Sequence, residues 1–178
     1  MKLVAFIQTP APSAATKIAE AMADEHHLVS FQDRTFDLMT GLLDVPDSRV
    51  LEKDEPLESL HGKTIRETMD SLNDWTHGFF GEDIGIARVK SESERWFAHH
   101  CENPDTGMVI IDDLRTPEQL QFVVDNNGLV VRLTNNGSSA GLLSGVDAVE
   151  IETAGRDART LAKQVLQLAN SYFVAVAA

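Results

Sequence analysis

Cysteine, positive charge and long apolar runs are all scarce in this chain of 178 residues. Its single cysteine, Cys101, cannot form an internal disulfide, which excludes a disulfide framework and makes a cytoplasmic setting the expectation. No apolar run reaches the length of a membrane span, and the first residues do not have the charged-then-apolar pattern of a signal peptide. We therefore expect no membrane partner.

The shortage of positive charge restricts the partners further. The chain has 15 Lys and Arg against 28 Asp and Glu, which gives a formal net charge of −13. Phosphate backbones need clustered Lys and Arg, so we expect no DNA or RNA duplex as a partner. The negative charge also disfavours an anionic mononucleotide unless a local basic pocket overrides it.

Several catalytic motifs are absent. The chain contains no HExxH, no GxGxxG and no CxxC. Its GxSxG match, residues 137–141, lies in the small-residue loop 134–145 and not at the strand-to-helix turn that makes a nucleophile elbow. Hydrolase, zinc-enzyme and Rossmann-type redox functions are therefore without support from sequence motifs.

The residues that are present favour one domain, spanning 1–178, that can bury a core of ordinary size. Apolar patterning alternates between short buried-strand runs and helical spacing. This alternation predicts an α/β fold with a mostly parallel sheet, in which ligands bind at the carboxyl ends of the strands. Strands are expected at 2–7, 27–31, 108–111, 129–133 and 148–151, and helices at 14–23, after Asp33 through 43, and at 64–75, 83–101, 117–127 and 157–175.

Some boundaries carry specific signals. Thr64 and Glu67 have the spacing of a capping box, and Pro117 suits the first turn of a helix. Asn127 followed by glycine predicts a left-handed helix end. We expect residues 78–81 to break the preceding helix, and the polar, proline-containing stretch 44–60 to be weakly ordered.

The first strand, loop and helix have the layout of a phosphate-binding loop, but the residues that bind phosphate are replaced. Aligned with GxxxxGK[ST], the sequence TPAPSAAT places Thr9 and Ala14 at the two glycine positions. Ala15 stands at the lysine position, and only Thr16 keeps the hydroxyl that would bind Mg²⁺. Lys17 comes two residues later than Ala15, so on a helix its side chain points elsewhere. The sequence therefore predicts a degenerate phosphate loop.

Short matches in a consistent order run through most of the chain. They are Phe31-Gln32-Asp33, Arg66-Glu67, Asp74-Trp75, Gly81 to Ile84, Ile110 to Gln119 and Val130 to Leu133. In this order the chain resembles the bacteriophage-type deoxynucleoside monophosphate kinases, which belong to the P-loop nucleoside monophosphate kinase group. Arg34 stands where that family has proline, and His77 where it usually has arginine.

The resemblance implies a three-layer P-loop NTPase-like fold and a phage or prophage origin. It also implies ATP and Mg²⁺ as cofactors if the protein is active, with Mg²⁺ bound by Thr16 and Asp112. The partners it implies are a nucleoside or deoxynucleoside monophosphate and a second copy of the chain as a homodimer. The substrate-binding residues it implies are Asp33, Arg34, Arg66, Glu67, Trp75, Asp113, Arg115 and Arg132.

Each of these residues also has an interpretation without function. Asp112 and Asp113 could cap the next helix, and the arginines could form surface ion pairs. For Trp75 and Trp96 we expect packing in the core rather than stacking on a base.

The expected lid, residues 134–145, contains no Lys or Arg, although kinases of this type stabilise the transferring phosphoryl group with such cations. This loss, together with that of the loop lysine, favours a nucleotide kinase-like protein without ordinary ATP-dependent transfer. Two alternatives remain open. One is an active kinase that takes its cations from Lys17, Arg88 or Arg95, and the other is an acidic protein-interaction domain.

Overall fold

A computed structural model of the chain describes residues 1–7, 13–23, 25–31, 41, 54–81, 84–99, 107–135, 143 and 145–177. Contacts within the chain group these residues into two compact units. One unit comprises Met1–Phe31 and Arg88–Ala178, and the other, Gln32–Ala87, is inserted between its two parts. The helix expected after Asp33 falls in the stretch 32–53, which lies outside the described residues apart from position 41.

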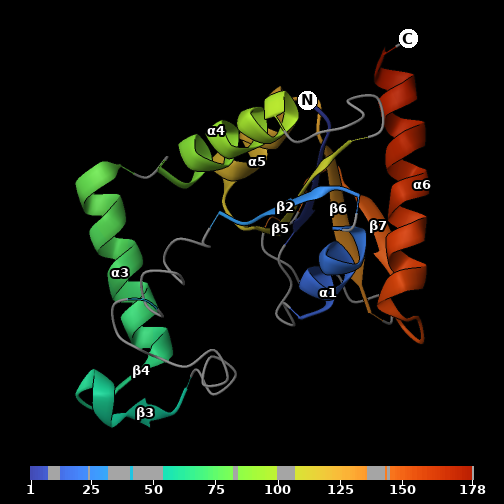
Figure 1. Cartoon of the computed structure of the whole chain (residues 1–178). Helices are drawn as coiled ribbons and strands as arrows, with labels where there is room; N and C mark the ends of the chain where they lie inside the picture. The colour runs from blue at the N-terminus through green and yellow to red at the C-terminus, as the bar shows by residue number, and fades with distance from the viewer. Residues whose placement is uncertain are drawn as a thin grey trace. The chain divides into compact units, whose positions relative to one another are not determined.

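The first unit is built on a parallel β-sheet (Figure 1). In the described part of the chain it has five strands, in the order β2-β5-β1-β6-β7. All four neighbouring pairs are parallel, so the carboxyl ends of the strands share one edge. The strands are β1 (Leu3–Ile7), β2 (His27–Val29), β5 (Val109–Leu114), β6 (Leu129–Thr134) and β7 (Val149–Glu152).

The central strand β1 has the composition that a sheet covered on both faces requires. All five of its residues are buried, and it pairs with β5 on one side and β6 on the other. Continuous apolar strands of this kind are typical of parallel sheets with helices on both faces. β5 continues beyond the expected end at residue 111, because Ile7 pairs with Leu114 after an irregularity in the register.

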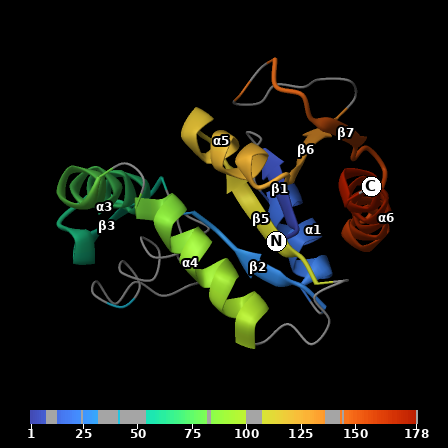
Figure 2. The same cartoon turned by 90° about the horizontal axis from the view of Figure 1, so that it is seen from above.

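Helices cover the two faces of this sheet (Figure 2). On one face α1 (Ser13–Met22) packs against α6 (Ala158–Ala177), and on the other lie α4 (Ile84–His99) and α5 (Pro117–Asp125). This arrangement is the α/β fold with a mostly parallel sheet that the sequence predicts, in three layers. The core of the α1/α6 face comprises Val4, Phe6, Ala15, Ile18, Ala19, Met22, Met108, Ile110, Leu129, Val131, Leu133, Ile151, Leu161, Ala162, Val165, Ala169 and Phe173.

Local capping signals determine how several helices begin and end. Thr116 and Gln119 form a capping box at α5, where Pro117 occupies the first turn as expected. Asn127 has a φ of 51°, which confirms the left-handed helix end. Gly128 follows, and a side chain there would collide with Val123.

The inserted unit contains β3 (Pro56–Leu57), β4 (Lys63–Thr64) and α3 (Ile65–Phe80). A short 3₁₀ turn, Glu58–Leu60, connects the two strands, which pair antiparallel. Among the described residues of this unit, Leu60 and Ile65 are buried in one apolar cluster, and Leu57, Met69 and Leu72 pack against them partly exposed.

Residues 56–60, at the end of the stretch 44–60, form β3 and the 3₁₀ turn. One expectation for the inserted unit is wrong. The helix does not stop at Trp75 but continues through Gly78 to Phe80. A single glycine costs a helix only about 1 kcal/mol, and the helix ends at Gly81, whose φ is 95°. The capping box of Thr64 and Glu67 is confirmed.

Candidate functional site

The carboxyl edge of the sheet has a topological switch point between β1 and β5, the position at which α/β sheets form a ligand crevice. These strands are neighbours, and the helices that follow them, α1 and α5, lie on opposite faces of the sheet (Figure 2). Where the connections of two adjacent parallel strands leave in opposite directions, α/β sheets bind their ligands. Of the residues that the structure describes, the first turn of α1 and the end of β5 follow this pair of strands most closely.

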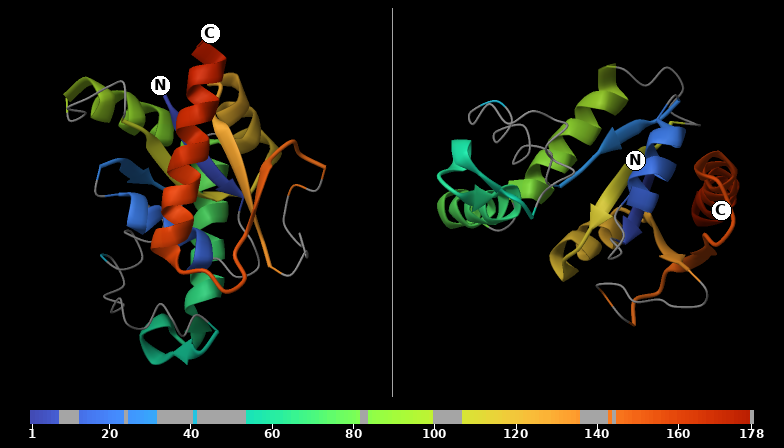
Figure 3. Two further views of the ribbon diagram at one scale, coloured as in Figure 1. Left: turned by 90° about the vertical axis from the view of Figure 1, so that its right-hand side faces the viewer. Right: turned by 90° about the horizontal axis from the view of Figure 1, so that it is seen from below.

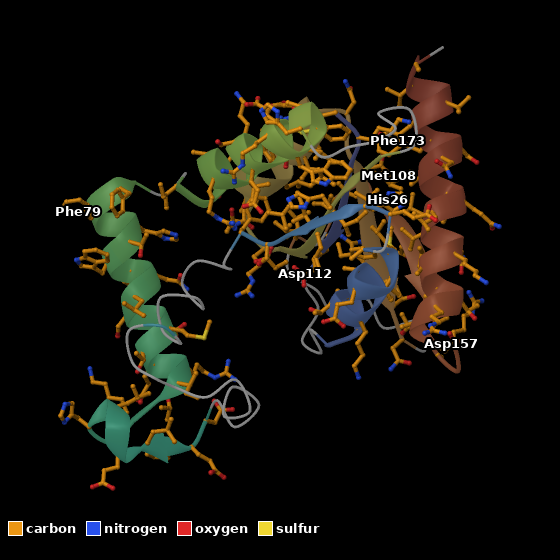
Figure 4. The ribbon with its side chains drawn as sticks, viewed as in Figure 1. His26, Phe79, Met108, Asp112, Asp157 and Phe173 are labelled. Atoms are coloured by element: carbon orange, nitrogen blue, oxygen red, sulfur yellow. The ribbon has the colours of Figure 1, made fainter. Side chains whose placement is uncertain are left out.

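At this point a hydroxyl meets a carboxylate. Thr16 Oγ1 donates a hydrogen bond of 2.8 Å to Asp112 Oδ2, joining α1 to β5 (Figure 4 labels Asp112). The two residues that the sequence predicts as Mg²⁺ ligands are thus brought together from positions 96 residues apart. Hydroxyl and carboxylate oxygens are ligands that Mg²⁺ accepts, the remainder usually being water and substrate phosphate. The donor set therefore fits Mg²⁺ held partly by a phosphate.

The two oxygens alone do not make a complete metal site. Within the described residues, no group of three or more His, Cys, Asp or Glu side chains could hold a metal ion. A metal at Thr16 and Asp112 would therefore depend on a bound anion for further ligands.

The two glycine positions and the lysine position of the phosphate loop carry no positive charge in this chain. Ala15, at the lysine position, is fully buried in the core between α1 and the sheet, and Ala14 packs against the same cluster. Lys17 is exposed and lines a groove between α1 and α6, rather than sharing the direction of Thr16. Thr9 lies outside the described residues. The start of α1 therefore offers a hydroxyl but no lysine directed at Asp112.

Asp113 fixes the end of β2. Its carboxylate accepts hydrogen bonds from Ser30 Oγ at 2.7 Å and from the backbone N–H of Phe31 at 2.8 Å. The Phe31 ring in turn contacts Phe122 of α5 edge to face. Asp113 is 6% exposed, so these bonds satisfy a buried carboxylate and hold three elements together. The predicted contact with substrate remains a prediction beside this structural role.

Two further predicted substrate residues lie on the same unit. Arg115 follows β5, and its backbone N–H donates to Gln119 Oε1 at 2.9 Å, which orders the entry to α5. Arg132 is buried in β6, and its guanidinium donates to the carbonyl of Leu143 at 2.8 Å. A longer contact of 3.5 Å joins it to Glu150 of β7. Arg132 therefore anchors the far end of the expected lid, of which residues 136–142 and 144 lie outside the described part of the chain.

The inserted unit carries the remaining predicted residues. Arg66 forms two hydrogen bonds to the carboxylate of Asp54, at 2.6 and 3.2 Å, and this partner raises the pKa of the guanidinium. Glu67 accepts from the backbone and hydroxyl of Thr64, which lowers the pKa of Glu67. Both residues thus have surface interactions of their own. Asp33 and Arg34 lie outside the described residues.

Trp75 is not a core residue, and the expectation of core packing is wrong for it. It is 57% exposed and stacks on Phe79, with Phe80 edge to face. Trp96 differs, because it is half-buried and stacks on His27 with 5.5 Å between ring centroids. The reason for the difference is length: α3 extends past Leu72, the last residue of its unit's apolar cluster, so the aromatic residues that follow project beyond that cluster.

Comparison with models of known protein families gives no match, and neither does comparison with curated protein sequences. Among the described helices, none combines the length and the apolar character needed to cross a bilayer. Function must therefore be argued from the residues of this chain.

Proposed function

We propose that this protein is a deoxynucleoside monophosphate kinase-like protein that binds a nucleotide at the carboxyl edge of the sheet and lacks ordinary ATP-dependent phosphotransfer. The bound phosphate would lie at the crevice between β1 and β5. Thr16 and Asp112 would hold Mg²⁺ there, and the metal would neutralise phosphate charge. The P-loop NTPase-like identity of the fold belongs to the same proposal.

The observation that carries the proposal is the 2.8 Å hydrogen bond between Thr16 and Asp112 directly beside a buried alanine. In a metal–phosphate site, the protein ligands of Mg²⁺ are typically a hydroxyl in the first turn of a helix and a carboxylate at the end of the neighbouring strand. Ala15 occupies the place of the lysine that would contact the terminal phosphates. Thr16 thus supports nucleotide binding, and the adjacent Ala15 supports the loss of phosphotransfer.

The missing cations explain why transfer would fail. A lysine or arginine that stabilises the transferring phosphoryl group is worth on the order of several kcal/mol in the transition state. The loop has Ala15 instead, and residues 134–145 contain no Lys or Arg. Each ~1.4 kcal/mol lost slows the reaction about tenfold, so losing two such contacts slows transfer by many powers of ten.

Calorimetry and an activity assay together test this function. We expect a deoxynucleoside monophosphate from a panel of the common bases to bind in the presence of Mg²⁺, while a coupled assay for ADP release stays at the level of buffer. Turnover with any of the monophosphates would contradict the loss of transfer. An absence of binding by every nucleotide tested would contradict the binding role.

Two substitutions separate a metal-binding role of the crevice from a structural one. Asp112→Asn keeps an oxygen that accepts the Thr16 hydrogen bond but removes the negative charge. We expect it to preserve the melting temperature and to abolish the Mg²⁺ dependence of nucleotide binding. Thr16→Val, of similar shape but without the hydroxyl, should weaken binding and also lower stability. If Asp112→Asn binds nucleotide with unchanged Mg²⁺ dependence, the pair is structural only.

A further inference from the structure

A groove on the α1/α6 face has a lining that includes neither Thr16 nor Asp112. The lining holds more Lys and Arg than Asp and Glu, although the chain as a whole is acidic. It has a volume of about 650 Å³, within the range of small-molecule sites. α1 and α6 lie side by side along it (Figure 3, left), and the residues before β2 close one end. The lining includes three cations, Lys17, Arg159 and Lys163.

These three cations form no ion pair with any carboxylate in the described part of the chain. The ion pairs found there involve other residues, such as Arg66 with Asp54 and Arg88 with Glu92. In a protein with 28 acidic and 15 basic residues, a surface cation has an ample supply of partners. Because the three cations that line the groove have no carboxylate partner among the described residues, their positive charges are available to a bound anion.

Two of the cations stand where helix electrostatics disfavours them. Arg159 and Lys163 are four residues apart, so they lie on the same face of α6, where like charges destabilise a helix. They also occupy the first two turns of α6, near the positive end of its dipole. Asp157, at the foot of α6 in Figure 4, caps the helix through Thr160. Residues that oppose local stability in this way are candidates for a functional role.

The floor of the groove is apolar. Met22 and Ala162 are buried beneath it, and Ala21 and Leu166 are partly exposed to it. An occupant that only carried charge would leave this floor uncovered, whereas one with an apolar body would cover it. A small number of polar groups around an apolar floor is the usual composition of a small-molecule site.

His26 adds a neutral polar group at the β2 end of the groove (Figure 4). Its Nδ1 is buried and has no hydrogen-bond partner among the described residues. Burial lowers the pKa of His26, while Glu25 partly offsets this by raising it. A neutral imidazole can donate a hydrogen bond to a ligand or accept one from it without adding charge.

We infer that this groove binds a small organic anion, a phosphate monoester or carboxylate attached to an apolar body. The anionic group lies against Lys17, Arg159 and Lys163, and the body covers Ala21, Met22 and Leu166. Glu20 and Glu25 also line the groove, and their negative charges repel an anion that lies against them. The site is separate from the crevice at Thr16 and does not depend on the proposed function.

The net charge of the chain limits the size of the occupant. A long polyanion would extend beyond the three cations and meet the acidic remainder of a surface with net charge −13. A small anion remains within the groove and experiences mainly the local positive charge. The acidic surface around the groove therefore favours a metabolite-sized ligand over a nucleic acid.

NMR titration of the ¹⁵N-labelled full chain tests the inference, with phenyl phosphate as the probe. We expect amide shifts concentrated at residues 17–26 and 158–166. Inorganic phosphate, which lacks the body, and phenol, which lacks the anion, should each bind at least ~10-fold more weakly, because each contacts only part of the site. Shifts confined to residues 13–16 and 110–116 would place the probe in the crevice instead and overturn the inference.

Substitutions test the role of the charges. Arg159→Glu and Lys163→Glu should each lower the affinity for phenyl phosphate at least ~10-fold, because they replace an attractive charge with a repulsive one. Glu20→Gln should raise the affinity, because it removes a repulsive charge. Lys90→Glu on α4, also an exposed lysine, serves as the matched control and should leave the affinity unchanged. Arg159→Gln provides a milder variant, with circular dichroism as the check on folding. Equal affinity for all of these variants would refute the groove as an anion site.

Discussion

At the scale of single residues, Gly128 is where the backbone after α5 approaches a neighbouring side chain. A Cβ at this position would lie 2.6 Å from Val123 Cγ1, 2.9 Å from the Val123 carbonyl oxygen and 3.0 Å from Leu3 Cβ. Two of these atoms, the carbonyl oxygen and the Cβ of central strand β1, cannot move aside by side-chain rotation. Only glycine fits without displacing the sheet.

The glycines at 128 and 78 should therefore respond to alanine in opposite directions. Gly128→Ala is expected to destabilise the protein by about 1–3 kcal/mol, the usual cost of overpacking. Gly78 lies inside α3, with no atom within 4 Å of a Cβ built there. Gly78→Ala should stabilise by about 0.5–1 kcal/mol through helix propensity. Denaturant unfolding measures both, and a Gly128→Ala variant as stable as the parent would contradict the close approach.

At the scale of elements, α6 depends on one carboxylate at its start. Asp157 accepts from Thr160 Oγ1 at 2.7 Å and from the Thr160 N–H at 3.0 Å. These bonds, the hydroxyl first, lower the pKa of Asp157 below its ordinary value of 3.8. The cap thus contributes stability that is present above pH 3.8 and is lost as the pH falls through the lowered pKa.

Replacing this cap should lower stability in a pH-dependent way. We expect Asp157→Ala to lower the melting temperature at pH 7, because both hydrogen bonds are lost. Asp157→Asn, whose single amide oxygen still accepts from the Thr160 N–H, should lower it less. The difference between the parent and Asp157→Asn should shrink below pH 3.8 as the carboxyl is protonated. Circular dichroism melts at pH 7, 5 and 3 provide the measurement. A constant difference at all three values would argue against a charged cap.

Sequence patterns at this scale predict what is local and fail where distant residues decide. Both capping boxes lie within four consecutive residues, so propensity and hydrogen bonding alone specify them. The extension of β5 through Asp112 to Leu114 depends on pairing with β1, which the local sequence does not contain. α3 ends at Phe80, beyond the predicted end at Trp75, because a single glycine costs a helix too little to stop it.

In the candidate site, too, the sequence predicts local features but not contacts between distant residues. The degenerate loop at Ala14 to Thr16 is visible in the sequence, because a motif is defined by spacing. The family resemblance places Thr16 and Asp112 at one metal ion, but the direct hydrogen bond between them depends on the register of a parallel strand pair, which the sequence does not show. Sequence spacing places only two of the groove cations together, since Arg159 and Lys163 lie on one face of the same helix. Only packing brings Lys17 to the same groove.

At the scale of the whole molecule, the two units differ in how much apolar surface they bury. The sheet unit encloses β1 completely and has an extensive core on the α1/α6 face. The inserted unit, Gln32–Ala87, has an apolar cluster with two fully buried members, Leu60 and Ile65, within the described residues. Regions with few buried apolar contacts open more readily than the core of a domain.

Native-state hydrogen exchange should therefore separate the two units. We expect amides of α3 and of the β3–β4 pair to exchange through local opening, well before those of β1, β5 and β6. Mass spectrometry of peptic fragments after deuterium labelling provides the measurement. As an internal control, α6 packs on the sheet and should exchange as slowly as the strands. Equal protection in α3 and β1 would mean that the units unfold together.

The position of β1 at the centre of the sheet also affects synthesis on the ribosome. β1 emerges first, but its neighbours β5 and β6 begin at Val109 and Leu129, so both of its edges stay unpaired while most of the chain is translated. Non-local pairing of this kind is slow, and exposed apolar strands aggregate. The nascent chain thus presents the segment LVAFI to chaperones long before it can be enclosed.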